Sequence, residues 1–262
     1  MLSVTNRQYE ALIEARKREL VRELVAHCRQ RFPLIVQPLD DAALTMVVAR
    51  RVDRALARGW TLKGSVRLDL NLTLLFGVGF HDDPQYPWAA RILGLSPTLT
   101  EQRRADRLAA AATSYLDDVH GVSGCTAVAA LQRLEGALRA VGGARALVPQ
   151  PSREAFIDEV AVFWPEKAER VGPSGLSAVW DRAEEETARF GIDGAHGTLV
   201  LAVVMTAFGH RCLEDRVYPW IVASIADRGA PSQGRVTLLE RKATRWMRVV
   251  TAMGIIGCNG EQ

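Results

Sequence analysis

The residues with the clearest chemical potential form the run Phe80-His81-Asp82-Asp83. An imidazole and two carboxylates in one loop could hold a metal ion or act as an acid/base pair. The run 132 residues later, Cys212-Leu213-Glu214-Asp215, keeps the acids and lacks the histidine. Adjacent loop residues rarely converge on one ion without ligands from elsewhere. We therefore expect no metal and no cofactor. Asp83 and Asp215 should instead accept hydrogen bonds from backbone N–H groups at the start of a proline-led helix.

The other histidines, 27, 120, 196 and 210, share no common spacing. His196 and His210 flank one predicted helix, which would place them roughly 20 Å apart, so they cannot share a ligand. We expect His210 to be a partly buried cap. The chain has no P-loop, nucleophile elbow or His-Glu-x-x-His zinc helix. No catalytic residue is expected from these motifs.

Six aromatic residues recur in the same order around these loops: Phe76, Tyr86, Trp88, Phe208, Tyr218 and Trp220. They could be anchors for a partner, because tryptophan and tyrosine are common in binding hot spots. They could equally be core residues. Their presence in both halves favours the core, since a fold determinant must survive in each copy whereas one binding site need not.

These matches belong to an internal repeat with an offset of 132 residues and no gap. The identical pairs include Pro33 and Pro165, Gly59 and Gly191, Phe76-Gly77 and Phe208-Gly209, Asp83 and Asp215, and Tyr86-Pro87-Trp88 and Tyr218-Pro219-Trp220. Chance poorly explains a shared order of glycine, proline and aromatic residues. The sequence predicts two tandem divergent copies of one helical module.

Helical spacing of apolar residues, with proline and glycine at the ends, predicts the elements that position these loops. An amphipathic helix ends at Pro33, and a shorter equivalent runs from the N-cap Ser152 to Pro165. The further helices are Asp41 to Arg58, Ser174 to Phe190, Ser65 to Phe76, Gly197 to Phe208, Pro87 to Leu93, Pro219 to Asp227, Glu101 to Asp118, Gln233 to Ala252 and the linking helix Ala127 to Ala140.

Two of these predictions carry more detail. Ser65 to Phe76 and Gly197 to Phe208 are apolar on almost every side, so we expect them at the centre of their bundles, although Thr198 to Met205 could compete as a strand. Thr98 and Glu101 have capping-box spacing. The fold class is therefore all-α. The predicted domains are 1–140, the first module with the linking helix, and 141–262, the second module, with a linker at 141–151.

The composition and charge of the chain exclude several classes of function. The 262 residues are 48% hydrophobic and 24% charged, with a net charge of +3. Acids and bases interleave along the first helix, which argues against nucleic acid as a partner. The longest apolar stretch, Thr198 to Phe208, is too short to span a membrane. The four cysteines, 28, 125, 212 and 258, have no metal or redox spacing, so reduced thiols and a cytoplasmic location are expected.

The stretch from Asp69 to Ala89, DLNLTLLFGVGFHDDPQYPWA, together with Arg31-Phe32-Pro33, resembles a group of small bacterial helical proteins associated with type VI secretion effector loci. The resemblance covers roughly residues 5–118. In the second copy it extends only to Phe208-Gly209 and Tyr218-Pro219-Trp220. It implies an accessory protein that binds another protein and brings no catalytic residues with it.

Three functions follow as hypotheses. The first is a non-enzymatic adaptor or chaperone whose partner is a secreted effector or a spike component. The second is a cognate immunity protein that binds and neutralises a toxin. The third is a metal-dependent enzyme that uses His81, Asp82 and Asp83.

Overall fold

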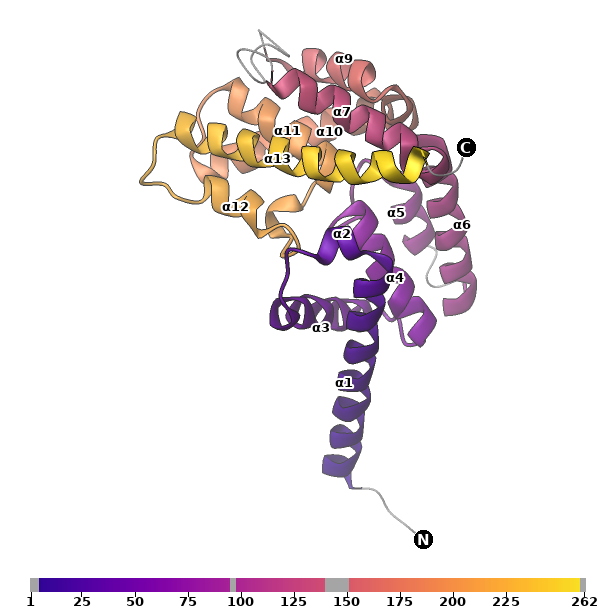
Figure 1. Ribbon diagram of the computed structural model, residues 1–262. Coiled ribbons are helices and arrows are strands. Elements are labelled where there is room, and N and C mark those ends of the chain that lie inside the picture. The colour runs from indigo at the N-terminus through magenta and orange to yellow at the C-terminus, as the bar shows by residue number, and fades with distance from the viewer. Residues whose placement is uncertain (1–4, 95–97, 140–150, 260–262) are drawn as a thin grey trace.

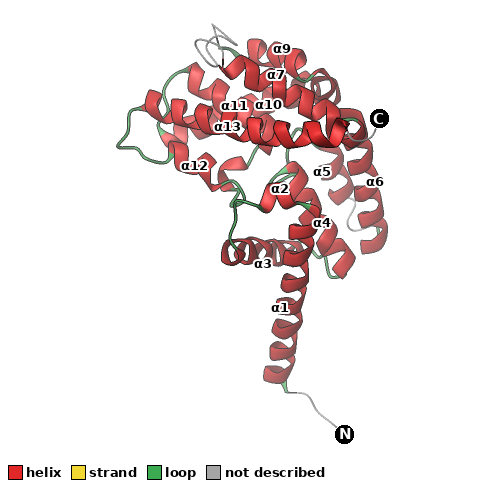
Figure 2. Cartoon of the chain, in the orientation of Figure 1, coloured by secondary structure: helices red, strands yellow, loops and turns green. Residues whose placement is uncertain are grey.

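The chain is all-helical throughout the part that the structure describes. This computed structural model describes residues 5–94, 98–139 and 151–259, and each secondary-structure element within them is a helix (Figures 1 and 2). The predicted fold class is therefore confirmed. No helix among these residues is long and apolar enough to cross a membrane.

The N-terminal half builds a bundle from which its first helix projects (Figure 1). Its helices are α1 (Asn6–Arg31), α2 (Pro33–Val36), α3 (Asp41–Ala57), α4 (Lys63–Phe76), α5 (Pro87–Gly94) and α6 (Glu101–His120). Side-chain caps begin three of them, because Thr5, Asp40 and Thr100 each accept a backbone N–H of the first turn. The N-cap of α6 is thus Thr100, and the prediction that Thr98 caps this helix is wrong.

The C-terminal half lies above the first in Figure 1. It comprises η1 (Val122–Gly124), α7 (Cys125–Arg139), α9 (Arg153–Phe163), α10 (Pro165–Phe190), α11 (Ala195–Phe208), η2 (Cys212–Glu214), α12 (Pro219–Ile225) and α13 (Ser232–Asn259). The predicted N-cap Ser152 accepts the N–H of Ala155. Helix α10 begins earlier than predicted, at Pro165, because it continues through a kink at Gly172, where φ is 75°.

Helices α4 and α11 are the innermost elements of their halves, as their apolar sequences predict. Both have 14 residues and both end at a glycine. Helix α11 is buried on nearly every side. Helix α4 tolerates an acid because Asp69 is paired with Arg58 at 2.8 Å. The alternative of a strand at Thr198 to Met205 is wrong.

Helix α7, the predicted linking helix, packs most extensively on α13 and also contacts α6 and α9. It therefore touches both halves rather than only the first, with which the sequence groups it. The predicted linker at 141–151 lies outside the described residues except for Pro151.

The cysteines differ from expectation in one case. Cys28 and Cys212 are buried free thiols, and burial raises the pKa of Cys28 to about 11. Cys125 is disulfide-bonded, so the expectation that every thiol is reduced is wrong for this residue.

Candidate functional site

The centre of the molecule is formed by the two loops, 77–86 and 209–218, that follow α4 and α11. Gly77 and Gly209 end these helices with a φ of 88° each, a conformation that only glycine adopts readily. A Cβ atom on Gly77 would lie 2.1 Å from the carbonyl oxygen of Phe208, and one on Gly209 would lie 2.7 Å from that of Phe76. The loops therefore pack backbone against backbone.

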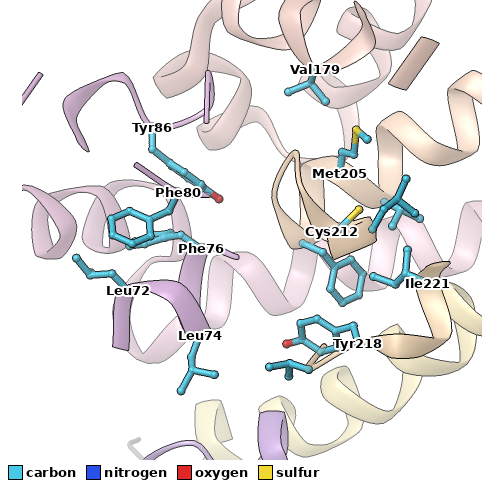
Figure 3. Packing of buried hydrophobic residues seen from close by; sticks show 14 of the residues in the cluster. Leu72, Leu74, Phe76, Phe80, Tyr86, Val179, Met205, Cys212, Tyr218 and Ile221 are labelled. Atoms are coloured by element: carbon cyan, nitrogen blue, oxygen red, sulfur yellow. The ribbon is translucent and has the colours of Figure 1, made fainter. Parts of the chain in front are cut away.

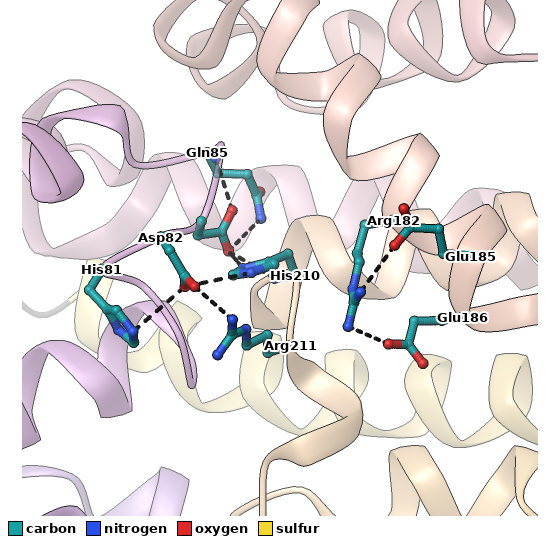
Figure 4. Close-up of polar contacts among 9 residues, drawn as sticks. His81, Asp82, Gln85, Arg182, Glu185, Glu186, His210 and Arg211 are labelled. Carbon is teal, nitrogen blue, oxygen red and sulfur yellow. Dashed lines mark hydrogen bonds and ion pairs between the residues drawn. The ribbon is translucent and has the colours of Figure 1, made fainter. Parts of the chain in front are cut away.

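Asp83 links one loop to the other through its buried carboxylate. Its Oδ1 accepts the Gln85 N–H at 2.9 Å, and its Oδ2 accepts the His210 N–H at 2.8 Å. The His210 imidazole Nδ1 also lies 2.9 Å from Oδ2 (Figure 4). His210, predicted to be a partly buried cap, is 8% exposed.

Asp215 makes the corresponding contacts in the opposite direction. Its Oδ1 accepts the Val217 N–H at 3.0 Å, and its carboxylate is also bonded by the backbone of Val78. Arg51 adds a buried ion pair at 3.3 Å. Burial raises the pKa of Asp215, and the Arg51 charge opposes that shift. Both aspartates thus bind backbone N–H groups, and the donors lie within the loops, whereas the prediction placed them at the starts of the proline-led helices.

The remaining acid and histidine of the predicted cluster face the opposite loop. Asp82 pairs with Arg211 at 2.7 Å, and the Nε2 atoms of His81 and His210 each lie 3.7 Å from its Oδ1 (Figure 4). Burial, assisted by the positive charge of Arg58, lowers the pKa of His81 to about 4. Among the described residues, no three histidine, cysteine, aspartate or glutamate side chains are grouped as metal ligands would be.

The six recurrent aromatic residues form two clusters in the core. Phe76, Tyr86, Phe208 and Tyr218 are each at most 8% exposed, and Trp88 and Trp220 are partly buried against them. The ring centroids of Phe76 and Tyr86 lie 4.8 Å apart (Figure 3). Those of Phe208 and Tyr218 are also 4.8 Å apart. The interpretation of these residues as core is the one that their burial favours.

A cavity of about 230 Å³ lies beside this junction, and the sequence did not reveal it. Its walls are mostly apolar and come from both halves, and Tyr86, Phe208 and Tyr218 are among its lining residues. Lys167 of α10 also lines it and is only 2% exposed. One sequence signal does mark Lys167, because the position 132 residues earlier is the apolar Ile35.

The other histidines stand apart from one another. His196 and His210 lie at opposite ends of α11, as predicted. His27 contacts Asn71 at 2.8 Å, and burial lowers the pKa of His120, which lines the cavity, to about 4.

No protein-family model, characterised protein or solved structure matches this chain. The molecule thus offers an interlocked junction, an apolar cavity with a buried amine, and the projecting helix α1.

Proposed function

We propose that this protein is a non-enzymatic accessory protein that binds another protein through the projecting part of helix α1. The observation that carries this proposal is an uncovered apolar stripe on that helix. Tyr9, Leu12 and Ile13 are 59%, 52% and 47% exposed. The stripe has the i, i+3, i+4 spacing of one helix face.

The position of α1 leaves this stripe without a neighbour from the described part of its own chain. Its buried residues, Val21, Leu24 and Cys28, all lie in its second half, where it packs on α2 and α3. The first half extends away from the body (Figure 1). A capping box at Thr5 stabilises its free end. Isolated helices shorter than about 12 to 15 residues are only marginally stable in water, and the projecting half of α1 is of this length. Contact with a partner would therefore stabilise it.

The form of this surface favours a groove as its complement. Amphipathic helices commonly bind by inserting anchors at this spacing into an apolar groove of another protein. Acidic and basic residues, such as Glu10 and Lys17, flank the stripe and would lie at the rim of such an interface. We therefore expect the partner to supply an apolar groove with charges of both signs at its edges.

We further propose that the chain is a tandem duplication of one module. Several parallels at an offset of 132 residues support this inference. Helices α4 and α11 have the same length, their terminal glycines have the same φ, and Asp83 and Asp215 bind equivalent atoms. Among the described residues, the projecting helix belongs to the first half, and the described equivalent of α1 in the second half is α9, which has 11 residues. This difference favours binding by the first half.

The resemblance to proteins of type VI secretion loci makes a secreted effector the first candidate partner, bound by an adaptor or chaperone. An immunity protein that neutralises a toxin is the second. A cytoplasmic location is part of either proposal, although the disulfide at Cys125 is more typical of an oxidising compartment. Separation of cell compartments followed by immunoblotting tests this point.

The binding proposal is tested with the double variant Leu12→Glu/Ile13→Glu. Tagged protein is purified from its native cells, and co-purifying proteins are quantified by mass spectrometry. A partner recovered at comparable stoichiometry with the native chain should be lost with the variant. The matched control is Val162→Glu, which places a charge on an exposed apolar residue of α9, 68% exposed. Equal recovery with both variants would contradict a role for α1.

The partner then distinguishes the two roles. If expression of the partner alone stops cell growth and co-expression of this protein restores it, the immunity function is supported. If the partner is harmless in the cytoplasm but is secreted only when this protein is present, the adaptor function is supported. Either assay should fail with Leu12→Glu/Ile13→Glu and succeed with Val162→Glu.

A further inference from the structure

The cavity beside the loop junction has the composition of a ligand site. It lies where α2, α4, α6, α7, α10, α11 and α13 converge, and its volume is about 230 Å³. Its lining includes Leu74, Leu131, Trp164, Phe208, Tyr218 and Trp246. Two further lining residues, Leu34 and Leu75, are 45% and 38% exposed. The cavity therefore opens to solvent between α2 and the end of α4.

Lys167 places a single cation in this apolar wall. Its Nζ donates a hydrogen bond to the Thr206 carbonyl, and it lies 4.8 Å from the ring centroid of Trp164 and 5.8 Å from that of Tyr86. No carboxylate among the described residues forms an ion pair with it. Asp83 is not in contact with Lys167, and only its charge favours the protonated amine. The carboxylate oxygens of Asp83 accept hydrogen bonds from the N–H groups of Gln85 and His210.

A lysine this deeply buried usually has an acidic partner. Burial lowers the pKa of Lys167 to about 8, so the amine is still mostly protonated at neutral pH. A positive charge in an apolar cavity, with two of its three N–H bonds not used by the Thr206 carbonyl, favours an anion that brings its own apolar body. His120, in the same wall, is held neutral by burial and does not compete for that anion.

We propose that this cavity binds a small amphiphilic carboxylate, with the carboxylate on Lys167 Nζ and the apolar part between Leu131, Phe208 and Trp246. The volume sets the size of the ligand. A cavity of about 150 Å³ accommodates benzene, so this one accommodates about nine or ten non-hydrogen atoms. A medium-chain fatty acid or phenylacetic acid has that size. The site is independent of the stripe on α1, so either proposal can fail alone.

Octanoate, with ten non-hydrogen atoms, is a suitable probe, and the fluorescence of Trp164 and Trp246 in the cavity wall reports its binding. Titration at pH 7 should give a saturable change. 1-Octanol has the same chain without the charge, and it should bind at least tenfold more weakly. Lys167→Met should weaken octanoate binding at least tenfold and leave octanol binding unchanged. The preference for the acid would then disappear.

A second variant separates loss of the site from loss of the fold. Val128→Trp fills the cavity from α7 and leaves Lys167 in place. It should abolish binding of both octanoate and octanol, while the melting temperature stays within a few degrees of the native value. The proposal is overturned if octanoate gives no saturable change, if Lys167→Met binds octanoate as the native chain does, or if Val128→Trp still binds it.

Discussion

Gly77 and Gly209 occupy positions 132 residues apart and lie against one another at the centre of the molecule. Each ends a buried helix, and each leaves room only for a hydrogen atom where the opposite backbone passes. At this point the two halves meet through main-chain atoms. This contact lets Asp83 and Asp215 reach the N–H groups of the opposite loop. The junction is therefore sensitive to a single added methyl group.

The first prediction concerns that methyl group. Gly77→Ala should lower the free energy of unfolding by about 3 kcal/mol or more, because the Cβ atom meets the Phe208 carbonyl and the positive φ also disfavours alanine. Gly172→Ala is the matched control, since Gly172 has φ 75° and ψ 166° but open space around it. Gly172→Ala should lower the free energy of unfolding by about 1 to 2 kcal/mol, from backbone strain alone. Urea unfolding of both variants measures the difference, and equal costs would refute a close approach at Gly77.

The second prediction concerns the buried pair of Arg51 and Asp215. Arg51→Met and Asp215→Asn should each destabilise the protein by about 3 kcal/mol, because each leaves a buried partner uncompensated. The double variant should cost less than the sum of the two, with a coupling energy of about 1 to 3 kcal/mol. The exposed pair of Arg153 and Asp181 is the control, with side chains 44% and 48% exposed. The double-mutant cycle of this exposed pair should give a coupling energy of less than about 1 kcal/mol. Equal coupling in the two cycles would mean that burial adds nothing to the first pair.

The sequence predicts the elements of this fold far better than the contacts between them. Helix ends at Phe32, Gly77, Gly191 and Gly209 follow from local chemistry, in which proline or a left-handed glycine stops the hydrogen-bond ladder. The sequence places the N-cap of α6 at Thr98, two residues before the true N-cap Thr100, because both threonine side chains can accept a backbone N–H. Local sequence patterns of this kind predict the end of a helix to within one helical turn.

The candidate site could be predicted only in part. The repeat singled out Asp83 and Asp215, but the partner of Asp83, His210, is 127 residues away, and no local pattern pairs them. The sequence does not predict the cavity, because its walls come from seven helices whose packing is not encoded in the period of any one helix. Comparison of Lys167 with Ile35 is the available signal, since a charge in one half at a position that is apolar in the other marks a site where the two halves differ.

The third prediction is a loss of stability in mild acid. Burial lowers the folded-state pKa of His81 and of His120 to about 4, against 6.5 for an exposed imidazole. Their neutral forms therefore favour folding above pH 6.5, and that contribution is lost as the pH falls from 6.5 towards 4. At about 1.4 kcal/mol per pKa unit, each of the two histidines should account for about 3 kcal/mol of this loss by the time the pH reaches 4.

Chemical unfolding at pH 7 and at pH 4.5, repeated with His81→Asn/His120→Gln, isolates their part from that of the carboxylates. The variant should show the shallower pH dependence of the two proteins. NMR titration of the imidazole protons provides a direct check on each site. A midpoint near 6.5 for both histidines would contradict this prediction.

The last prediction separates what Lys167 contributes to binding from what it contributes to folding. Burial lowers its pKa from 10.5 to about 8, so the unfolded chain holds this proton more tightly than the folded protein does. The resulting penalty on folding is fully present below pH 8 and disappears as the pH rises through 10.5. Lys167→Met removes the penalty with a side chain of similar volume. At pH 7 this variant should be more stable than the native chain by about 1 kcal/mol.

The difference between the two proteins should narrow as the pH rises from 8 to 10.5, because the native chain then loses its buried charge. Lys63→Met is the control, since that side chain is 62% exposed and should leave stability nearly unchanged at every pH. Thermal melts across this pH range measure both variants. A destabilised Lys167→Met protein would mean that the hydrogen bond to Thr206 and the contacts with Trp164 outweigh desolvation. Lys167 would then have a structural reason to be buried, whereas a stabilised variant leaves ligand binding as the reason for keeping a cation in that wall.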